Sequence, residues 1–313
     1  MGEKINILFL GGSKRVSIAK AFLQVGIDLG YEVNIFSYEL NNFEPIASVG
    51  KIVPGLKWQD DQIKNHLKKT IVEFEINIVV PFVDIATILC SKLKEVCKNV
   101  FFCVSGLEIN TTLFDKKKSH SWFTDHKLNV PEIGDSLPFV AKPITGSGGK
   151  GMYFVKTQAE KNMFYSNNNA TDFLMQRFVE GVEYSVDCYL DRHQKIVSIV
   201  PRKRLETING EATRSVTERN EQIMLLSEKI LMIEDFSGPV TIQYIVEKDT
   251  SGIFIIEINP RLGSGVLTSI AAGANICKHI LFDYFNINIP SNQNWQENLL
   301  MVRAYQEFYF TCN

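Results

Sequence analysis

The sequence predicts an α/β protein that begins with a doubly wound parallel sheet and continues with paired strands. Over residues 1–105, short continuous apolar runs alternate with amphipathic helical stretches, which is typical of a parallel sheet covered on both faces. Residues 139–155 then read as strand, glycine-rich loop, strand. Further strand-like runs dominate residues 173–259. A chain of 313 residues provides room for two or three domains and a large core.

Composition excludes several classes of protein. The chain is 45% hydrophobic and 22% charged with a net charge of -2, which indicates a globular protein without a bulk nucleic-acid or membrane surface. No apolar run reaches the roughly 18–20 residues of a membrane span. Lys4 leads directly into a short strand, so no signal peptide is expected. The six cysteines form no C-x-x-C pair and the five histidines no H-E-x-x-H motif, so we expect reduced thiols, a cytoplasmic protein and no zinc site.

The N-terminal region shows the alternation most clearly. Strands are expected at 5–10, 32–38, 76–81 and 100–105, and helices at 16–29, 61–73 and 85–97. The turn Gly11–Arg15 follows the first strand, where ligands often bind at the carboxyl edge of such a sheet. It is not a G-x-G-x-x-G motif, and Glu39 lies too far along for the acidic residue of a dinucleotide site. A plain glycine turn with a solvated basic tip and a substrate contact both remain open.

Two charged features near this region have alternative interpretations. Asp84 follows the third strand and suits either a helix N-cap or a substrate contact. Residues 110–127 read as one polar helix that carries the run Asp115, Lys116, Lys117, Lys118, Ser119. Such a run is usually a solvated helix face, and that interpretation would prevail if the rest of the chain were ignored.

The segment around Lys142 indicates an anion-binding flap. Lys142 is embedded in an apolar strand at 139–143, and the loop TGSGGKG at 145–151 leads into a second strand at 152–155. A loop of the Rossmann or Walker A kind would lead into a helix instead. Glycine-rich backbone can present its N–H groups to phosphates, and a lysine at the base of the loop would add a point charge.

The segment IIEINPRLGSG at 255–265 offers a second set of functional side chains. Glu257, Asn259 and Arg261 are spaced by two, so an extended chain would point them to one side. Carboxylate and amide oxygens suit Mg²⁺, and a guanidinium suits a phosphate or carboxylate. Gln243, in the preceding strand-like run 240–248, could reach the same metal if the two strands pair. An ordinary hairpin with solvated polar residues is the alternative.

The remaining elements complete the expected pattern. Thr157–Glu160 forms a capping box that opens a short helix. Strands are expected at 173–181, 183–191, 195–206 and 305–310, and helices at 218–233 and 275–285.

Taken in order, these features resemble the ATP-grasp superfamily. The resemblance is carried by Asp115-Lys116, Lys142 before TGSGGKG, QRFVEGVEYSVD, Gln243 and EINPR. It is strongest to the synthetase domains of the carbamoyl-phosphate synthase large subunit and extends to biotin carboxylase and D-alanine–D-alanine ligase. It implies a Rossmann-like pre-ATP-grasp domain at 1–110, a lid subdomain with the flap at 111–178, and a C-terminal antiparallel subdomain with the metal site at 179–313, the last two clamping ATP.

The resemblance also implies roles for individual residues. Contacts to ATP are implied for Lys116, Lys142, Thr145, Gly146, Ser147, Gly148, Gly149, Gln176, Phe178, Val179 and Glu183. Within that set, Lys116 and Lys142 meet the phosphates, residues 176–179 read adenine and Glu183 meets the ribose. Metal ligands are implied at Gln243, Glu257 and Asn259, and catalytic contacts to the reacting phosphate at Arg261 and Lys142. Substrate contacts are suggested for Arg202, Arg204, Arg214 and Asp84, although Arg202, Arg204 and Arg214 equally suit an exposed basic strand end.

The activity implied is that of a ligase that uses ATP and Mg²⁺, with Mn²⁺ as a substitute. A small-molecule carboxylate would become an acyl phosphate, and an amine would then displace phosphate. A carbamoyl-phosphate-synthase-like subunit that needs a partner, and a nucleotide-binding module without activity, are the alternatives. Gln243 stands where many members have glutamate, as in the carbamoyl-phosphate synthase branch. Many relatives are dimers, so monomer and homodimer both stay open.

Overall fold

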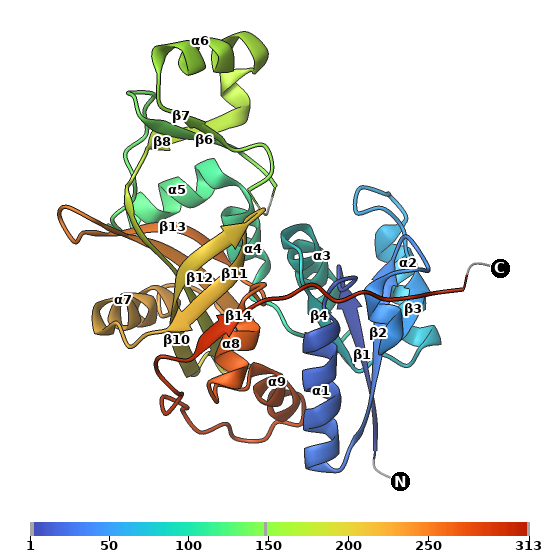
Figure 1. The fold of residues 1–313 in the computed structure, drawn as a ribbon. Helices are drawn as coiled ribbons and strands as arrows, with labels where there is room; N and C mark the ends of the chain where they lie inside the picture. The colour runs from blue at the N-terminus through green and yellow to red at the C-terminus, as the bar shows by residue number, and fades with distance from the viewer. Residues whose placement is uncertain (1–2, 147–148, 312–313) are drawn as a thin grey trace.

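The computed structural model describes residues 3–146 and 149–311 (Figure 1). The N-terminal part is a five-stranded sheet in the order β3-β2-β1-β4-β5 with every pairing parallel, which confirms the predicted doubly wound arrangement. Its strands are β1 (Lys4–Leu10), β2 (Glu32–Glu39), β3 (Lys51–Pro54), β4 (Ile78–Pro81) and β5 (Phe101–Phe102). Its helices are α1 (Val16–Leu29), α2 (Ile63–Glu73) and α3 (Asp84–Lys94), with a 3-10 turn η1 (Pro45–Ser48).

The alternation of side chains along β1 explains why this sheet is buried on both faces. Ile7 and Phe9 pack into the core shared with α1, whereas Leu8 and Leu10 pack into the core shared with α2 and α3. Gly30 ends α1 in the left-handed conformation with φ 79°, as its position after the last helical residue predicts.

A small three-stranded antiparallel sheet follows, in the order β7-β6-β8. It contains β6 (Phe139–Pro143), β7 (Tyr153–Val155) and β8 (Phe173–Arg177), with α6 (Gln158–Asn167) and the short η2 (Ala170–Asp172). β6 and β7 pair as the hairpin that the glycine-rich segment predicts. Thr157 and Glu160 form the predicted capping box at the start of α6. In Figure 1 this unit stands at the top of the molecule, above α5 and β13.

A six-stranded antiparallel sheet makes up the C-terminal part, in the order β13-β12-β9-β10-β11-β14. Its strands are β9 (Gly181–Leu190), β10 (Ile196–Ile208), β11 (Glu211–Thr217), β12 (Gly238–Glu247), β13 (Ile253–Asn259) and β14 (Leu300–Val302). One face is apolar and packs against α4 (Leu107–Phe114), α5 (Lys116–Asp125) and α7 (Glu221–Leu231). Leu113 and Phe123 from these helices share that core with Tyr184 and Tyr244 of the sheet.

Two further helices connect the C-terminal part to the N-terminal sheet. These are α8 (Val266–Ala271) and α9 (Ile276–Tyr284). Ile280 and Leu281 of α9 belong to the same core as Phe22 of α1, and Figure 1 shows the two helices side by side. After β14 the chain runs across toward β2, where Phe310 lies 5.9 Å from the ring of Phe43.

Several predicted elements differ from the structure. The strand expected at 305–310 is wrong, because the last pairing is made by β14 and residues 303–311 have no regular structure. The helix expected at 110–127 is two helices, since the side chain of Asp115 caps α5 by accepting from the backbone N–H groups of Lys117 and Lys118. β3, β11 and α8 were not anticipated. β3 and α8 are short, and β11 carries no continuous apolar run.

In the part of the chain that the structure describes, no helix is long and apolar enough to cross a membrane. The five cysteines in the same ranges, Cys90, Cys97, Cys103, Cys188 and Cys277, are free thiols.

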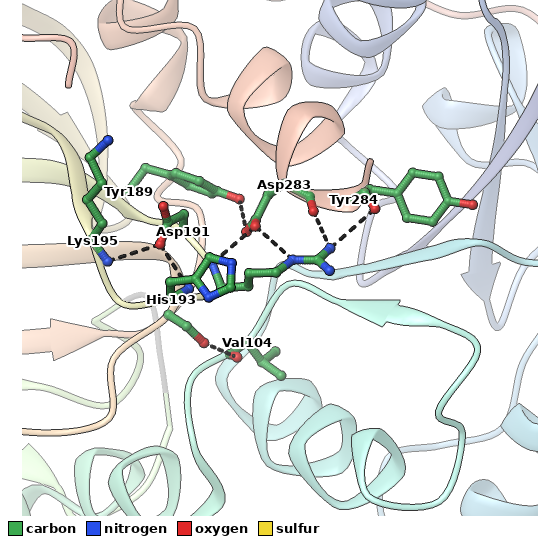
Figure 2. Close-up of polar contacts among 9 residues, drawn as sticks. Val104, Tyr189, Asp191, His193, Lys195, Asp283 and Tyr284 are labelled. Carbon is green, nitrogen blue, oxygen red and sulfur yellow. Dashed lines mark hydrogen bonds and ion pairs between the residues drawn. The ribbon is translucent and has the colours of Figure 1, made fainter. Parts of the chain in front are cut away.

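A buried carboxylate anchors α9 to the turn between β9 and β10 (Figure 2). Asp283 is 3% exposed and accepts hydrogen bonds from the hydroxyl of Tyr189 at 3.0 Å and from the backbone N and Nε of Arg192 at 3.1 Å. Arg192 also donates to the carbonyls of Asp283 and Tyr284. In the same turn, the carboxylate of Asp191 accepts from the backbone N–H groups of His193 and Lys195. This network fixes the C-terminal sheet against the helix that packs on α1.

Replacing Asp283 with alanine is predicted to lower the free energy of unfolding by about 2–4 kcal/mol, because a fully buried tyrosine hydroxyl and a guanidinium lose their acceptor. Asp61, an exposed aspartate, provides the matched control, and Asp61→Ala is expected to cost less than about 0.5 kcal/mol. Urea denaturation of both variants measures the difference. Equal stabilities would contradict an anchoring role for the Asp283 network.

Candidate active site

Polar side chains gather on the face of the six-stranded sheet opposite its apolar core. They come from neighbouring strands and are Glu183, Asp187, Arg202, Arg204, Gln243, Glu257 and Asn259. Residues directly opposite one another in paired strands point to the same side. The observed pairs Gln243–Ser185, Thr241–Asp187 and Arg202–Ser185 therefore place β9, β10 and β12 side chains on one face.

The hairpin of β12 and β13 brings the three expected metal ligands together. Gln243 stands opposite Glu257, and Asn259 stands opposite Thr241, two residues along. The sequence allows Gln243 to reach the metal only if these two strands pair, and the structure confirms that they do. One carboxylate and two amide oxygens consequently share one end of the sheet.

Arg204 lies beside these oxygen donors. Its Nη1 is 3.2 Å from Oε2 of Glu183 and 3.4 Å from Oε1 of Gln243. Burial lowers the pKa of Arg204, although the carboxylates of Glu183 and Glu257 act against that shift. The contact with Glu183 shows that the residue expected at the ribose hydroxyls is paired in this structure with a guanidinium from β10.

Arg261 lies just beyond β13 rather than within it. A tight turn, in which its N–H donates to the carbonyl of Asn259 at 2.7 Å, keeps its Nη2 3.3 Å from Oδ1 of Asn259. Its Nε and Nη2 donate to the two carboxylate oxygens of Asp84 at 2.5 and 3.3 Å. Burial acts to lower the pKa of Arg261, but the carboxylate of Asp84, together with those of Glu257 and Glu211, raises that pKa above its usual value.

The pair with Arg261 also settles how Asp84 is used. Val83 is the N-cap of α3, and Asp84 is the first residue of the helix and makes no side-chain capping bond. The N-cap interpretation is therefore wrong. The carboxylate of Asp84 instead connects the N-terminal sheet to the end of β13.

Lys142 is buried between the three-stranded and six-stranded sheets. It is 9% exposed, and its Nζ donates to Oε1 of Gln176 at 2.9 Å. Burial lowers the pKa of Lys142 to about 8; the carboxylates of Glu257 and Glu183 oppose the shift, whereas the ammonium of Lys116 adds to it. Lys142 and Gln176 line a narrow cavity together with Lys116, His120 and Glu257. Residues from the lysine-bearing strand and from the metal-ligand hairpin thus meet at one cavity.

His120 is a member of this cavity that the sequence did not reveal. The amide nitrogen of Gln176 lies 3.0 Å from Nδ1 of His120 and 3.3 Å from the carbonyl oxygen of Pro131. Burial and the charge of Lys142 lower the pKa of His120, so the neutral ring accepts a hydrogen bond from the amide N–H of Gln176. His120 sits at the end of a charged helical run, and nothing in its spacing distinguishes it from a solvated residue. Gln176, expected to read adenine, has its side chain directed to this interior network.

Hydrogen bonds connect the first part of the glycine-rich segment to the start of α5. Lys116 donates from its backbone N–H to the carbonyl of Ile144 and from Nζ to the carbonyl of Gly146, both at 2.9 Å. Gly146 and Gly149 have φ of 121° and 68°, which glycine adopts readily. The contact singles out Lys116 among the three lysines, because Nζ of Lys117 donates to the carbonyl of Thr171 instead.

The remaining residues predicted to contact ATP differ in exposure and position. Thr145 is exposed in the loop, whereas Ser147 and Gly148 lie outside the described residues. Phe178 directly follows β8, and its ring lies 6.2 Å from that of Phe154 on the flap hairpin. Val179 is buried next to it. The segment 178–179 therefore connects the small sheet to the large one.

The three arginines proposed for a substrate have different surroundings. Arg202 is 1% exposed, donates to both oxygens of Asp187 at 2.6 and 3.0 Å, and passes so close to Gly265 that a Cβ there would lie 2.4 Å from its Nη1. Arg202 thus packs against the loop after β13, and its contact with a substrate stays a prediction. Arg214 is exposed, and because its neighbour Ser215 pairs with Arg204, it points to the opposite side of the sheet. Only Arg204 lies beside the metal-ligand set.

Comparison with known proteins agrees with this arrangement. Residues 113–265 match the sequence profile of the ATP-grasp domain. Residues 113–265 are an ATP-grasp domain. The match spans the flap hairpin, Lys142 and the β12–β13 hairpin with Glu257 and Asn259.

More distant similarity to known proteins extends over most of the chain. D-alanine–D-alanine ligase of Rickettsia canadensis is 22% identical over 248 residues, which cover 63% of this chain and 70% of that protein. The biotin carboxylase domain of Hydrogenobacter thermophilus 2-oxoglutarate carboxylase, solved with MgADP and bicarbonate, superposes with a TM-score of 0.76 at 14% identity and covers 94% of this chain and 73% of its own. N5-carboxyaminoimidazole synthetase of Staphylococcus aureus superposes with a TM-score of 0.72 at 15% identity, covering 93% and 80%. The particular likeness to carbamoyl-phosphate synthase stays a prediction.

The titration of Lys142 gives a direct test of this ATP-grasp cavity. Its pKa in the folded protein is about 8, below the usual 10.5, so the buried ammonium destabilises the fold below pH 8 and this effect disappears as pH rises from about 8 to 10.5. We expect one lysine ¹³Cε resonance to titrate with a midpoint near pH 8 and to be missing in Lys142→Met. If every lysine resonance titrated above pH 10, the buried position of Lys142 would be contradicted.

Proposed function

We propose that this protein is a Mg-ATP-dependent ligase that activates a carboxylate as an acyl phosphate and joins it to an amine. The observation that carries the proposal is the meeting of Lys142 and Glu257 at one cavity between two sheets. A buried cation facing an oxygen-ligand set is suited to a metal-bound polyphosphate, which needs both kinds of partner. The ATP-grasp domain supplies the wider support for this ligase class.

The residues present fit magnesium bound together with a nucleotide. Within residues 3–146 and 149–311, no three His, Cys, Asp or Glu side chains form a group that could hold a metal. The hairpin offers Glu257, Asn259 and Gln243, so a single carboxylate is joined by two neutral amides. Magnesium typically keeps waters and uses one or two carboxylates together with substrate phosphates. These three side chains would hold magnesium, which would supply positive charge to offset that of the terminal phosphates.

The chain's own residues would then hold and orient the nucleotide. Lys142 would place a point charge at the phosphates. Lys116 binds the carbonyl of Gly146, and backbone N–H groups of the glycine-rich segment would cover the phosphates. Phe178 and Val179 offer apolar surface and backbone to adenine at the junction of the sheets. Arg261, fixed by Asp84, points a guanidinium at the end of the ligand set where charge develops during transfer.

Residues 1–110, 111–178 and 179–313 remain our proposed division into pre-ATP-grasp, lid and C-terminal parts. The sheets fall within these limits. Helices α4 and α5, however, pack into the core of the large sheet, and α9 packs on α1. If the lid moves, the hinge is therefore expected in the extended segments around 127–138 and 178–180 rather than at residue 111.

Phosphate release from Mg-ATP tests the proposal. Pools of carboxylates, amino acids among them, are supplied with and without pools of amines. Release that requires both pools is expected, together with a loss of at least about 100-fold in Glu257→Ala, because the only carboxylate of the ligand set is removed. Glu228→Ala, which alters an exposed glutamate on α7, is the control and is expected to retain activity.

Gln243 favours one second candidate. In place of the glutamate of many members, it matches the carbamoyl-phosphate synthase branch. In that case bicarbonate and added ammonia would suffice for phosphate release from Mg-ATP in the assay. A partner protein would supply the ammonia otherwise. ATP binding with no release under any condition would favour a non-catalytic module, and no ATP binding would overturn the assignment.

The pKa of Lys142 predicts how nucleotide affinity depends on pH. Bound phosphates would raise that pKa, so above pH 8 binding must take up a proton, and affinity should fall by up to about tenfold per pH unit. Below pH 8 it should be nearly constant. Calorimetry on Lys142→Met is expected to show affinity about 10–100-fold weaker and without this pH dependence. Lys118→Met, which alters an exposed lysine two positions beyond Lys116, should behave as wild type.

A further inference from the structure

Three guanidinium groups cluster at the carboxyl edge of the N-terminal sheet. Arg15 ends the Gly11–Arg15 turn after β1, Arg261 follows β13, and Arg303 follows β14. They are close enough that the charges of Arg261 and Arg303 both act on Arg15, whose pKa is lowered by burial and by these two neighbours against the opposing effect of Glu211. Arg15 at the tip of the glycine turn is therefore turned inward, toward the site, whereas Lys14 beside it is exposed.

Among the described residues, two carboxylates form ion pairs with these three guanidiniums. Asp84 is engaged with Arg261. Glu211 serves both of the others: its Oε1 accepts from Nη1 and Nη2 of Arg15 at 3.3 Å, and its Oε2 accepts from Nη1 of Arg303 at 2.9 Å. A single carboxylate thus bridges two arginines, which is the contact pattern that a bound carboxylate or phosphate makes.

Glu211 is well placed to be exchanged for a ligand. It follows the Asn209–Gly210 turn at the tip of the β10–β11 hairpin, where both turn residues have positive φ of 51° and 77°. Its side chain is 44% exposed, compared with 21% for Arg15 and 27% for Arg303. The guanidiniums are held more firmly: Arg303 also donates to the carbonyl of Ser264 at 2.5 Å, and Arg15 lies 6.0 Å from the ring of Phe82. Arg15 and Arg303 are therefore held in place by further contacts, whereas Glu211 lies at the start of β11, directly after a turn.

The cluster occupies the position where an open parallel sheet binds ligands. In the order β3-β2-β1-β4-β5 the strand order reverses between β1 and β4. The turn ending in Arg15 follows β1, and Asp84 follows β4, so both flank this switch point. Ligands of doubly wound sheets bind in the crevice beyond such a point. Arg261 then joins the crevice to the metal-ligand hairpin.

A dinucleotide is disfavoured at this crevice. The carboxylate of Glu39, at the end of β2, lies against the Gly11–Arg15 turn: burial raises its pKa, while the hydroxyl of Ser37 and the backbone N–H groups of Gly12 and Ser13 lower it. The N–H groups that would meet a pyrophosphate thus already face a carboxylate. The anion-binding capacity that remains belongs to the arginine side chains.

We propose that Arg15 and Arg303 form a subsite for an anionic group that the substrate carries in addition to its reacting carboxylate, and that Glu211 occupies this subsite until the substrate displaces it. The inference deepens the proposed ligase function, on which it rests for the reacting carboxylate near Arg261. It names the substrate class as a dicarboxylate or a phosphorylated acid. A monocarboxylate would leave both guanidiniums with Glu211.

Binding without nucleotide tests the subsite separately from the reaction. Succinate, L-glutamate and glycerol 3-phosphate are titrated by calorimetry, with propionate and L-glutamine as partners that lack the second anion, and with inorganic phosphate to separate a phosphate site from a carboxylate site. At least one dianionic probe is expected to bind Glu211→Gln about tenfold or more tightly than wild type. The same probe should lose about tenfold or more in Arg15→Gln and in Arg303→Gln. Lys14→Gln, an exposed neighbour of equal charge, should match wild type.

Each outcome has a distinct meaning. Failure of every dianionic probe to bind Glu211→Gln, with folding verified by circular dichroism, would overturn the subsite, as would equal losses in Arg15→Gln and Lys14→Gln. Binding that depends on Arg15 but is never accompanied by ATP-dependent phosphate release would sustain the subsite and reject the ligase proposal. Release with monocarboxylates alone, unaffected by Arg15→Gln, would sustain the ligase and reject the subsite.

Discussion

The antiparallel register of β12 and β13 is the constraint on which the candidate site depends. Gln243 stands opposite Glu257 and Asn259 opposite Thr241, so all the oxygen donors share one face. A slip of one residue would turn Glu257 and Asn259 into the apolar core against α4 and α5. Burial of Tyr244 and Ile258 on the opposite face makes that slip costly, because it would expose them to water. The core of the large sheet therefore specifies the geometry of the site.

The positive charge of Lys142 in the cavity is not fully compensated by neighbouring carboxylates, which suits an anionic ligand. Burial disfavours the ammonium of Lys142 more than Glu257 and Glu183 favour it, so a polyphosphate would relieve a cost already present in the fold. Arg261 differs, since the carboxylates of Asp84, Glu257 and Glu211 together outweigh the effect of burial on its pKa. Lys142 can therefore gain from a bound anion, whereas Arg261 is already held in position by Asp84. The Asp84 pair and the Asp283 network together keep the N-terminal sheet aligned with the hairpin.

Local sequence patterns predict those features of the fold and the site that follow from strand geometry alone. Continuous apolar runs predicted the strands around β1, and the spacing of Glu257 and Asn259 predicted a shared face, because both follow from strand geometry. Contacts between distant segments were not accessible in this way. His120 reaches Gln176 across 56 positions, and Arg15 reaches Glu211 across 196, so only the tertiary fold reveals them. The exposed alternative for Arg202 is wrong for a related reason: a guanidinium buried against Asp187 has the same sequence signature as an exposed one.

A crystal structure with magnesium and a non-hydrolysable ATP analogue tests the central claim most directly. The account predicts triphosphate between the loop 145–151 and the hairpin, within hydrogen-bonding distance of Lys142, and metal on Glu257 and Asn259. It also predicts adenine beside Phe178 and Val179. Nucleotide bound at the Gly11–Arg15 turn, or metal away from Glu257, would contradict the account.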